Sequence, residues 1–295
     1  MKQSKLFTCG LLLCTTCIAL NASITVKVKE NKNKNTIAID KVQYRITYET
    51  KAVLNDTTVT DSLGRYLYSS DEMRLDIGDK VNVFYNYTQQ VHDSIVNDLA
   101  AKGNYDMRNA GKAGAITWRI YKNYPEGKFK YLDFVLFDKY CNTEAIENPQ
   151  WNIVPDSTKE IMGYQCQMAE TFYKGRHWTA WYTDDIPLDC GPWKLGGLPG
   201  LILQAQDQSK QYIFTGIGLQ NVAGKEAIEY KEEYNQYEEI KLKQFAEIKR
   251  KSSIGDILKG MGKNVKIEVH SNTPNEDIDT QKLLNQTDPY NPIEE

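Results

Sequence analysis

The chain has 295 residues, of which 41% are hydrophobic, 11% aromatic and 25% charged, and its formal net charge is −3. This composition is typical of a folded protein and excludes an intrinsically disordered one. The acidic balance argues against nucleic acid or an anionic membrane surface as a main partner.

The first residues have the layout of a secretory signal peptide. Lys2 and Lys5 precede a largely apolar run, Leu6–Leu20, and small residues follow for cleavage after Ala22. The run is short for a stable membrane-spanning helix. An uncleaved membrane anchor is the first alternative, and a lipid anchor on one of the cysteines of this segment is the second.

We therefore predict a signal peptide at residues 1–22 and a single domain at residues 23–295. The protein would be exported to the periplasm, to the outer membrane or to the cell exterior, and would not span a membrane after cleavage. Loss of two lysines would change the net charge from −3 to −5.

Three cysteines would remain after cleavage, namely Cys141, Cys166 and Cys190. Two of them are expected to pair in an oxidising compartment. Of the three possible pairs, Cys166–Cys190 is favoured because both residues lie in the same β-rich region. The third cysteine would be a buried free thiol or, as the alternative, a reactive one.

Half-buried β-strands are predicted wherever apolar and polar residues alternate. This pattern occurs at Val42–Thr50, Val81–Tyr87, Ile116–Ile120, Phe129–Phe137 and Val265–Val269. Short turns such as Pro125–Gly127 between these runs indicate antiparallel meanders.

Helices are predicted in two places. Val91–Lys102 carries an apolar stripe, and Tyr237–Leu258 carries apolar residues on one side and many Lys and Glu residues on the other. Residues 271–295 are polar and are expected to form a surface tail. Together these elements predict a mainly antiparallel β domain, curved into an open barrel or bowl with one or two packed helices.

Residues 163–219 are rich in glycine and aromatic side chains and carry most of the information about function. As a strand, residues 176–183 would place Arg176, Trp178, Ala180 and Tyr182 on one face and His177, Thr179, Trp181 and Thr183 on the other. Both faces carry a tryptophan, so we expect both to be covered or one to line a cavity.

Residues 197–202 of this stretch read Gly197-Leu-Pro-Gly-Leu-Ile202. This hexapeptide resembles the signature of the GLPGLI family of exported bacterial proteins. Further similarities are Phe84-Tyr85, Asp93-Ser-Ile95, Gly163-Tyr-x-Cys166, Gly175-Arg176, Ala180-Trp-Tyr-Thr183, Ile186-Pro187, Gly191-Pro192 and Asn291-Pro-Ile-Glu294. Cys190 departs from the pattern, because a small polar residue is expected there, and this departure puts the proposed disulfide in doubt as a family feature.

The resemblance implies a secreted or periplasmic protein, in some cases encoded near outer-membrane receptors. A similar module precedes the catalytic part of a bacterial peptide N-glycosidase, which implies a bowl-like β domain rather than an active site. In the hexapeptide, Gly197 and Gly200 would be structural, forming a tight turn that leads into a buried strand, Leu201–Ala205.

The sequence lacks the common hydrolase motifs. It has neither His-Glu-x-x-His nor Gly-x-Ser-x-Gly, and its three histidines, His92, His177 and His270, are far apart. No cofactor and no metal site is expected. A nucleophilic Cys166 or Cys190 with His177 is conceivable, but a disulfide is the stronger interpretation.

Asp184-Asp185 resembles a catalytic carboxylate pair. Adjacent residues on a strand point to opposite faces, so these two would share a substrate only in a turn. Turn formation before Ile186-Pro187 is the preferred interpretation, and Asp207 would end its strand in the same manner.

Arg176 is the best polar candidate for function. Beside Trp178 and Tyr182 its guanidinium could bind a carboxylate or stack on a ring. The structural alternative is an arginine that holds a loop carbonyl or Asp184. A ligand groove along the hexapeptide would add Trp193, Leu198 and Pro199.

The leading hypothesis is therefore a non-enzymatic binding or accessory protein of the cell envelope. Its partner would be an outer-membrane receptor, another envelope protein, or a small apolar or peptide ligand in the concave side of the sheet. A carboxylate-dependent hydrolase and a purely structural surface protein are the alternatives.

Overall fold

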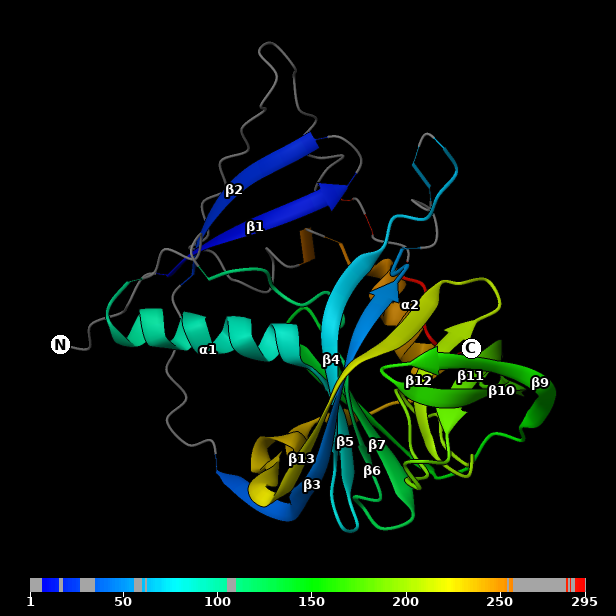
Figure 1. Ribbon diagram of the computed structural model, residues 1–295. Coiled ribbons are helices and arrows are strands. Elements are labelled where there is room, and N and C mark those ends of the chain that lie inside the picture. The colour runs from blue at the N-terminus through cyan, green and yellow to red at the C-terminus, as the bar shows by residue number, and fades with distance from the viewer. Residues whose placement is uncertain are drawn as a thin grey trace.

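The alternation of apolar and polar residues produces one large sheet. The computed structural model describes residues 7–15, 18–26, 35–55, 60–61, 63–104, 110–253, 255–256, 285, 287 and 290–294. Twelve strands form a sheet in the order β14-β8-β7-β6-β5-β4-β3-β13-β12-β11-β10-β9. Figure 1 labels most of these strands and shows the curvature of the sheet. Neighbouring strands are antiparallel except for the parallel pair β14–β8. The predicted mainly antiparallel β fold is confirmed.

The strands of this sheet, in chain order, are β3 (Thr36–Ala52), β4 (Ser69–Ile77), β5 (Asn82–Asn86), β6 (Arg119–Lys122), β7 (Lys128–Val135), β8 (Asp138–Ala145), β9 (Asn152–Ile161), β10 (Tyr164–Tyr173), β11 (Arg176–Thr183), β12 (Leu201–Asp207), β13 (Tyr212–Lys231) and β14 (Glu238–Glu239). The strands predicted near residues 42, 81, 116 and 129 correspond to β3, β5, β6 and β7. The run Val265–Val269 lies outside the described residues.

A separate two-stranded sheet pairs β1 (Phe7–Thr15) with β2 (Ile18–Val26). Most of this hairpin belongs to the segment predicted to be a signal peptide. Its cleavage stays a prediction.

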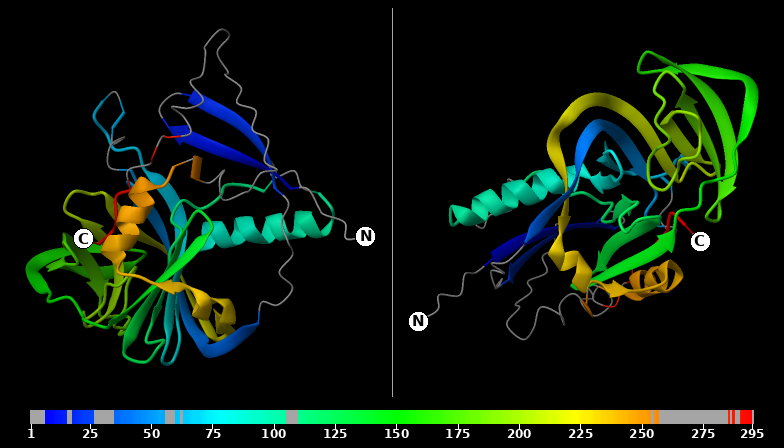
Figure 2. Two further views of the ribbon diagram at one scale, coloured as in Figure 1. Left: turned by 180° about the vertical axis from the view of Figure 1, so that it is seen from behind. Right: turned by 90° about the horizontal axis from the view of Figure 1, so that it is seen from below.

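The long strands β3 and β13 curve the sheet. They pair along most of their length, and the register shifts between Gly216 and Gly218, between Asn221 and Glu226, and between Ile228 and Glu229. Such bulges bend a strand and increase its twist. In Figure 2, β3 and β13 arch together. They divide the sheet into two arms, one that runs from β3 to β14 and one that runs from β13 to β9. The sheet stays open, because its outermost strands, β9 and β14, do not pair with each other.

The concave side of the sheet holds the main hydrophobic core. Tyr48, Phe84, Trp178 and Phe214 come from both arms and are at most 1% exposed. Their rings pack at centroid distances of 6.0 Å for Tyr48–Phe84 and for Phe84–Phe214, and of 6.3 Å for Trp178–Phe214. Burial of each such side chain contributes about 1.5–3 kcal/mol. Residues 184–200 fold into this core, so the concave side is filled by the chain itself.

The opposite face of the β3–β8 arm carries a second core that is rich in tyrosine. Tyr121, Tyr230 and Tyr234 are buried there with Val42, Val83, Leu132 and Ile228. The second half of β13 and the 3-10 helix η2 (Glu232–Gln236) supply the cover. Both faces of this arm are therefore partly buried.

The helix α1 (Tyr87–Ala101) begins four residues before the predicted position. Asn86 caps it, because its side-chain oxygen accepts a hydrogen bond from the Gln89 backbone. None of its residues is buried, so the apolar stripe does not enter the core. Figure 1 shows the helix projecting to one side of the sheet.

The helix α2 (Leu242–Lys251) is shorter than the predicted Tyr237–Leu258. Residues 237–241 instead lead through β14 into the helix, and the backbone N–H of Ile240 donates to the Cys141 carbonyl at 2.8 Å. Phe245 anchors α2 against Tyr140 and Tyr290. Neither α1 nor α2, the helices within the described residues, is long and apolar enough to cross a membrane.

Candidate functional site

Arg176 begins β11 and points into the concave side of the sheet. The preceding turn places Lys174 at φ 52° and Gly175 at φ 85°, a left-handed region that favours glycine. From there the strand alternates as predicted, with Arg176, Trp178, Ala180 and Tyr182 buried. His177 points to the other face and is exposed.

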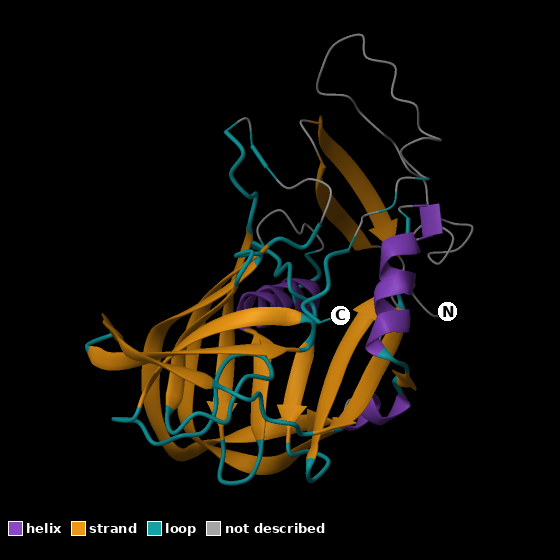
Figure 3. Ribbon diagram, turned by 90° about the vertical axis from the view of Figure 1, so that its right-hand side faces the viewer, coloured by secondary structure: helices purple, strands orange, loops and turns teal. Residues whose placement is uncertain are grey.

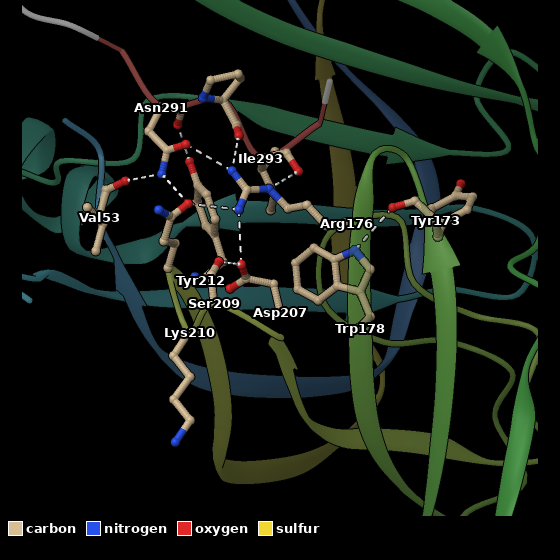
Figure 4. A network of polar contacts seen from close by, with 12 residues as sticks. Val53, Tyr173, Arg176, Trp178, Asp207, Ser209, Lys210, Tyr212, Asn291 and Ile293 are labelled. Atoms are coloured by element: carbon tan, nitrogen blue, oxygen red, sulfur yellow. Dashed lines mark hydrogen bonds and ion pairs between the residues drawn. The ribbon is translucent and has the colours of Figure 1, made fainter. Parts of the chain in front are cut away.

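Every N–H group of the Arg176 guanidinium has an acceptor. Nε donates to the carbonyl of Ile293 at 3.0 Å, and Nη2 donates to Asn291 Oδ1 at 2.9 Å and to the carbonyl of Pro292 at 2.6 Å. Nη1 donates to Asp207 Oδ2 and to Gln211 Oε1, each at 3.0 Å. An arginine side chain has five N–H donors, and all five are used here (Figure 4).

The segment 290–294 is therefore held between two parts of the sheet by hydrogen bonds to its main chain and side chains. The Asn291 backbone N–H donates to the Leu54 carbonyl at 2.9 Å, and its side-chain amide donates to the Val53 carbonyl at 2.7 Å. The Tyr212 hydroxyl donates to the Asn291 carbonyl at 2.6 Å. Figure 3 shows this end of the chain inside the curve of the sheet. Residues 290–293 are thus buried, whereas a surface tail was predicted for 271–295.

A cluster of two lysines and two glutamates holds the end of this segment. Lys194 Nζ lies 2.5 Å from Glu294 Oε1 and 2.8 Å from Glu144 Oε1, and its side chain is fully buried. Lys174 Nζ lies 2.8 Å from Glu144 Oε2 and 4.0 Å from Glu294 Oε2. The formal charges cancel within the cluster, which reduces the electrostatic penalty of burying Lys194.

The two carboxyl groups respond in opposite ways to this environment. Burial raises the pKa of Glu294 and outweighs the attraction of Lys194. Burial also raises the pKa of Glu144, but Lys194 and Lys174 outweigh it, so the pKa of that carboxyl is lowered. The side-chain carboxyl group of Glu294, at the end of the segment, therefore loses its proton less readily than a carboxyl group in water.

The other residues of the predicted ligand groove lie mostly in the core. Trp178, Tyr182, Trp193 and Leu198 are buried, and only Pro199 is exposed. The rings of Trp178 and Trp193 pack 5.3 Å apart. Arg176 follows the structural alternative in part, since it holds carbonyl groups and Asp207 in place of Asp184. Whether any of these residues binds a ligand stays a prediction.

The hexapeptide forms the tight turn that the sequence predicts, and β12 follows directly. Gly200 has no room for a side chain, because a Cβ there would collide with the Thr183 carbonyl. The backbone N–H groups of Leu201 and Ile202 donate to the carbonyls of Ile186 and Cys190, each at 3.0 Å. The turn thus anchors residues 184–200 to the sheet.

The cavity described on the concave side is small. A cavity of about 10 Å³, lined largely by apolar side chains that include Leu75, Phe84 and Trp193, lies against Cys190. That volume is close to the minimum for one water molecule. The space that a bowl could offer to a ligand is taken by residues 184–200 and 290–294.

The features that could support hydrolysis are separated. Asp184 and Asp185 are exposed in a turn, so the carboxylate pair does not line a buried cleft. His177 is exposed and stacks near Phe172, with ring centroids 4.8 Å apart, whereas Cys166 points into the core. No group of three metal-ligating side chains occurs among the described residues.

The expected Cys166–Cys190 disulfide is wrong for this structure, in which Cys141, Cys166 and Cys190 are free and buried. Cys166 lies on β10, the Cys190 carbonyl binds β12, and β11 separates those two strands. Burial raises the pKa of Cys141 and of Cys166 to about 11, and the pKa of Cys190 to about 12. Such thiols are not nucleophilic near neutral pH.

Sequence reasoning missed Lys194, Glu144 and Tyr212. Lys194 stands between apolar residues in the loop, and this is the only local sign of its burial. The role of Tyr212 depends on a partner 79 positions away. The motif Asn291–Glu294 was noticed only through the family resemblance.

Comparison with known proteins gives a partial match. Two solved structures, described as PNGF-II in the C2 and P21 space groups, have TM-scores of 0.42 and 0.43 and 15% sequence identity. Each alignment covers 70% of this chain but 32% of the PNGF-II chain, so this protein spans about a third of the length of those relatives. No curated protein matches the chain.

A model of one protein family also matches part of this chain, and the matched part contains Arg176, Lys194 and the hexapeptide. It does not extend to the segment 290–294. Residues 135–243 are thus similar to the family described as "N-glycanase peptide, N-terminal domain".

Proposed function

We propose that this chain is an exported, non-enzymatic binding or accessory protein of the cell envelope, as its resemblance to the GLPGLI family implies. Its binding site would be the concave side of the sheet, and its ligand an extended polypeptide. The carrying observation is that all five Arg176 donors are engaged by residues of the chain, three of them by the segment 291–293.

The chemistry of the site supports this proposal. Backbone carbonyls, an amide side chain and a carboxylate of one short segment are recognised by Arg176, Tyr212 and Lys194. Recognition of main-chain groups together with a few side chains is a common mode of peptide binding. The exposed positions of Asp184 and Asp185 remove the main support for the hydrolase alternative.

The test frees the segment 290–294 from its site by cutting the folded chain, and the residues that line the site stay unchanged. A protease site placed at Ser271, between α2 and the segment, allows the purified chain to be cut after it has folded. We expect the released fragment to exchange with a labelled peptide of residues 285–295. An Asn291→Ala peptide should bind at least about tenfold more weakly, because it loses several hydrogen bonds.

Arg176→Lys in the cut protein should weaken binding of the peptide by a similar factor, since lysine does not reproduce the guanidinium geometry. Lys51→Gln, a change of an exposed lysine on β3, is the matched control and should leave binding unchanged. If the fragment stays bound and excludes the peptide, the segment is a permanent part of the core and the proposed site does not exist.

Export is tested separately. Intact mass spectrometry of the protein purified from its host envelope should show a chain that begins at Ser23. A chain that still carries residues 1–22 would contradict the signal peptide but would leave the peptide site intact.

A further inference from the structure

The face of the sheet opposite the concave core carries two arginines on either side of a tyrosine. In the register of the sheet, Arg74 on β4 pairs with Tyr85 on β5, and Tyr85 is also the neighbour of Arg119 on β6. The residues between them, Leu75, Phe84 and Ile120, belong to the concave core. Because side chains alternate along a strand, Arg74, Tyr85 and Arg119 share the other face.

Arg74 lies over an aromatic ring, and its guanidinium has no hydrogen bond to another described residue. Its guanidinium carbon is 3.2 Å from the centre of the Tyr87 ring. Its Nε atom is buried and has no acceptor among the described residues. The remainder of the side chain is half-buried, so a ligand from solvent could reach the guanidinium.

Arg119 has aromatic and phenolic neighbours in place of a carboxylate. Its guanidinium carbon is 4.9 Å from the centre of the Tyr85 ring, and its side chain contacts the Tyr121 hydroxyl, with Tyr234 nearby. Within the described part of the chain, neither Arg119 nor Arg74 forms an ion pair. Neither guanidinium therefore has a carboxylate in direct contact among the described residues.

The neighbouring Arg45 shows what a structural arginine looks like on the same face. It binds Asp76 through two hydrogen bonds of 2.5 and 2.8 Å and Glu226 through one of 2.9 Å. Arg45 is thus in direct contact with two carboxylates, whereas no such contact is made by Arg74 or Arg119 within the described residues. The Tyr85 hydroxyl donates to Asp76 at 3.3 Å, and burial raises its pKa to about 12, so the phenol stays neutral.

The buried Nε of Arg74 has no acceptor among the described residues, and a buried donor without an acceptor costs free energy unless a ligand supplies one. Arginine is also the side chain best suited to bind planar or tetrahedral oxyanions with several hydrogen bonds. We propose that Arg74 and Arg119 bind the oxyanion group of a ligand, that is, a carboxylate, phosphate or sulfate, above Tyr85 and Tyr87. The site lies on the face opposite the segment 290–294 and is independent of the function proposed above.

The experiment uses the full chain and three probes, namely inorganic phosphate, sulfate and acetate, against chloride at the same ionic strength. Calorimetric titration and the thermal midpoint should both show binding of at least one oxyanion. Arg74→Gln and Arg119→Gln should each weaken it at least about tenfold, because each removes a charge-assisted contact. Arg65→Gln, which removes the same charge from an exposed side chain, should leave binding unchanged.

Stability without an added oxyanion separates a binding role from a structural one. The midpoints of Arg74→Gln and Arg119→Gln in chloride should stay close to that of the wild type, because neither arginine forms an ion pair with another described residue. A large fall of both midpoints would mean that the two arginines hold the fold, and the proposal would fail. It would fail equally if no probe bound, or if binding survived both substitutions. Preference for acetate over phosphate and sulfate would identify a carboxylate ligand.

Discussion

At the scale of single residues, burial and partners distinguish the arginines of this protein. Arg176 is buried, and all five of its N–H donors have acceptors. Arg119 is surrounded by aromatic rings and phenol groups, and no carboxylate contacts it among the described residues. The sequence correctly predicted the face on which Arg176 lies, because strand alternation is a local property. It could not predict the partners, since Asn291 is 115 positions away from Arg176.

Arg176→Gln should destabilise the fold by about 3–5 kcal/mol, because it leaves Asp207 and several carbonyls buried without a partner. Urea unfolding followed by tryptophan fluorescence measures the change. Arg65→Gln on the exposed surface should change the free energy of unfolding by less than about 0.5 kcal/mol. Equal effects of the two variants would contradict the clamp described for Arg176.

The three thiols should be unreactive in the native protein. Their pKa values of about 11 to 12 leave little thiolate at pH 8, and all three side chains are buried. A chromogenic disulfide reagent should label Cys141, Cys166 and Cys190 only after unfolding in urea. Rapid labelling before unfolding, or a missing pair of thiols after it, would contradict this arrangement.

At the scale of elements, turns and caps determine where the chain changes direction. The hexapeptide was predicted to turn tightly into a buried strand, and β12 begins at Leu201 as expected. The start of α1 was missed by four residues because the capping role of Asn86 depends on its position at the end of β5. The shorter α2 reflects the pairing of β14 with β8, which no local pattern announces.

Gly200→Ala should lower stability by about 2 kcal/mol or more, because the added methyl group meets the Thr183 carbonyl. Gly218→Ala is the matched control, since a Cβ at Gly218 has nothing within 4 Å. That variant should be neutral or slightly more stable. Thermal unfolding of both proteins tests whether the hexapeptide glycine is required by space.

The docking of segment 290–294 should depend on pH through Glu294. The docked carboxyl has a raised pKa, so its protonated form favours docking and its ionised form opposes it. Relative to Glu294→Gln, the wild type should therefore gain stability as the pH falls from 7 through the raised pKa towards 4.5. Urea titrations of both proteins at several pH values measure this difference, and a gain in the opposite direction would contradict the assigned shift.

At the scale of the whole molecule, the curved antiparallel sheet was predictable and its interior was not. Alternation in Val42–Thr50 and Phe129–Phe137 predicts strands, and the tyrosine-rich composition suits an extended sheet. The order of strands and the filling of the concave side depend on contacts between distant residues. The predicted ligand groove overlaps the place where residues 184–200 and 290–294 pack.

The pairing of β3 with β13 has a consequence for how the protein reaches its folded state. Tyr48 on β3 pairs with Gly216 on β13, and nine strands of the sheet lie between them in the chain. Contacts of such sequence separation form slowly, because the loop between them must be ordered first. During export from the N-terminal end, β3 would emerge long before β13 and would present a free edge to other chains. If the chain is exported as proposed, its folding should therefore benefit from a holding chaperone until β13 has arrived.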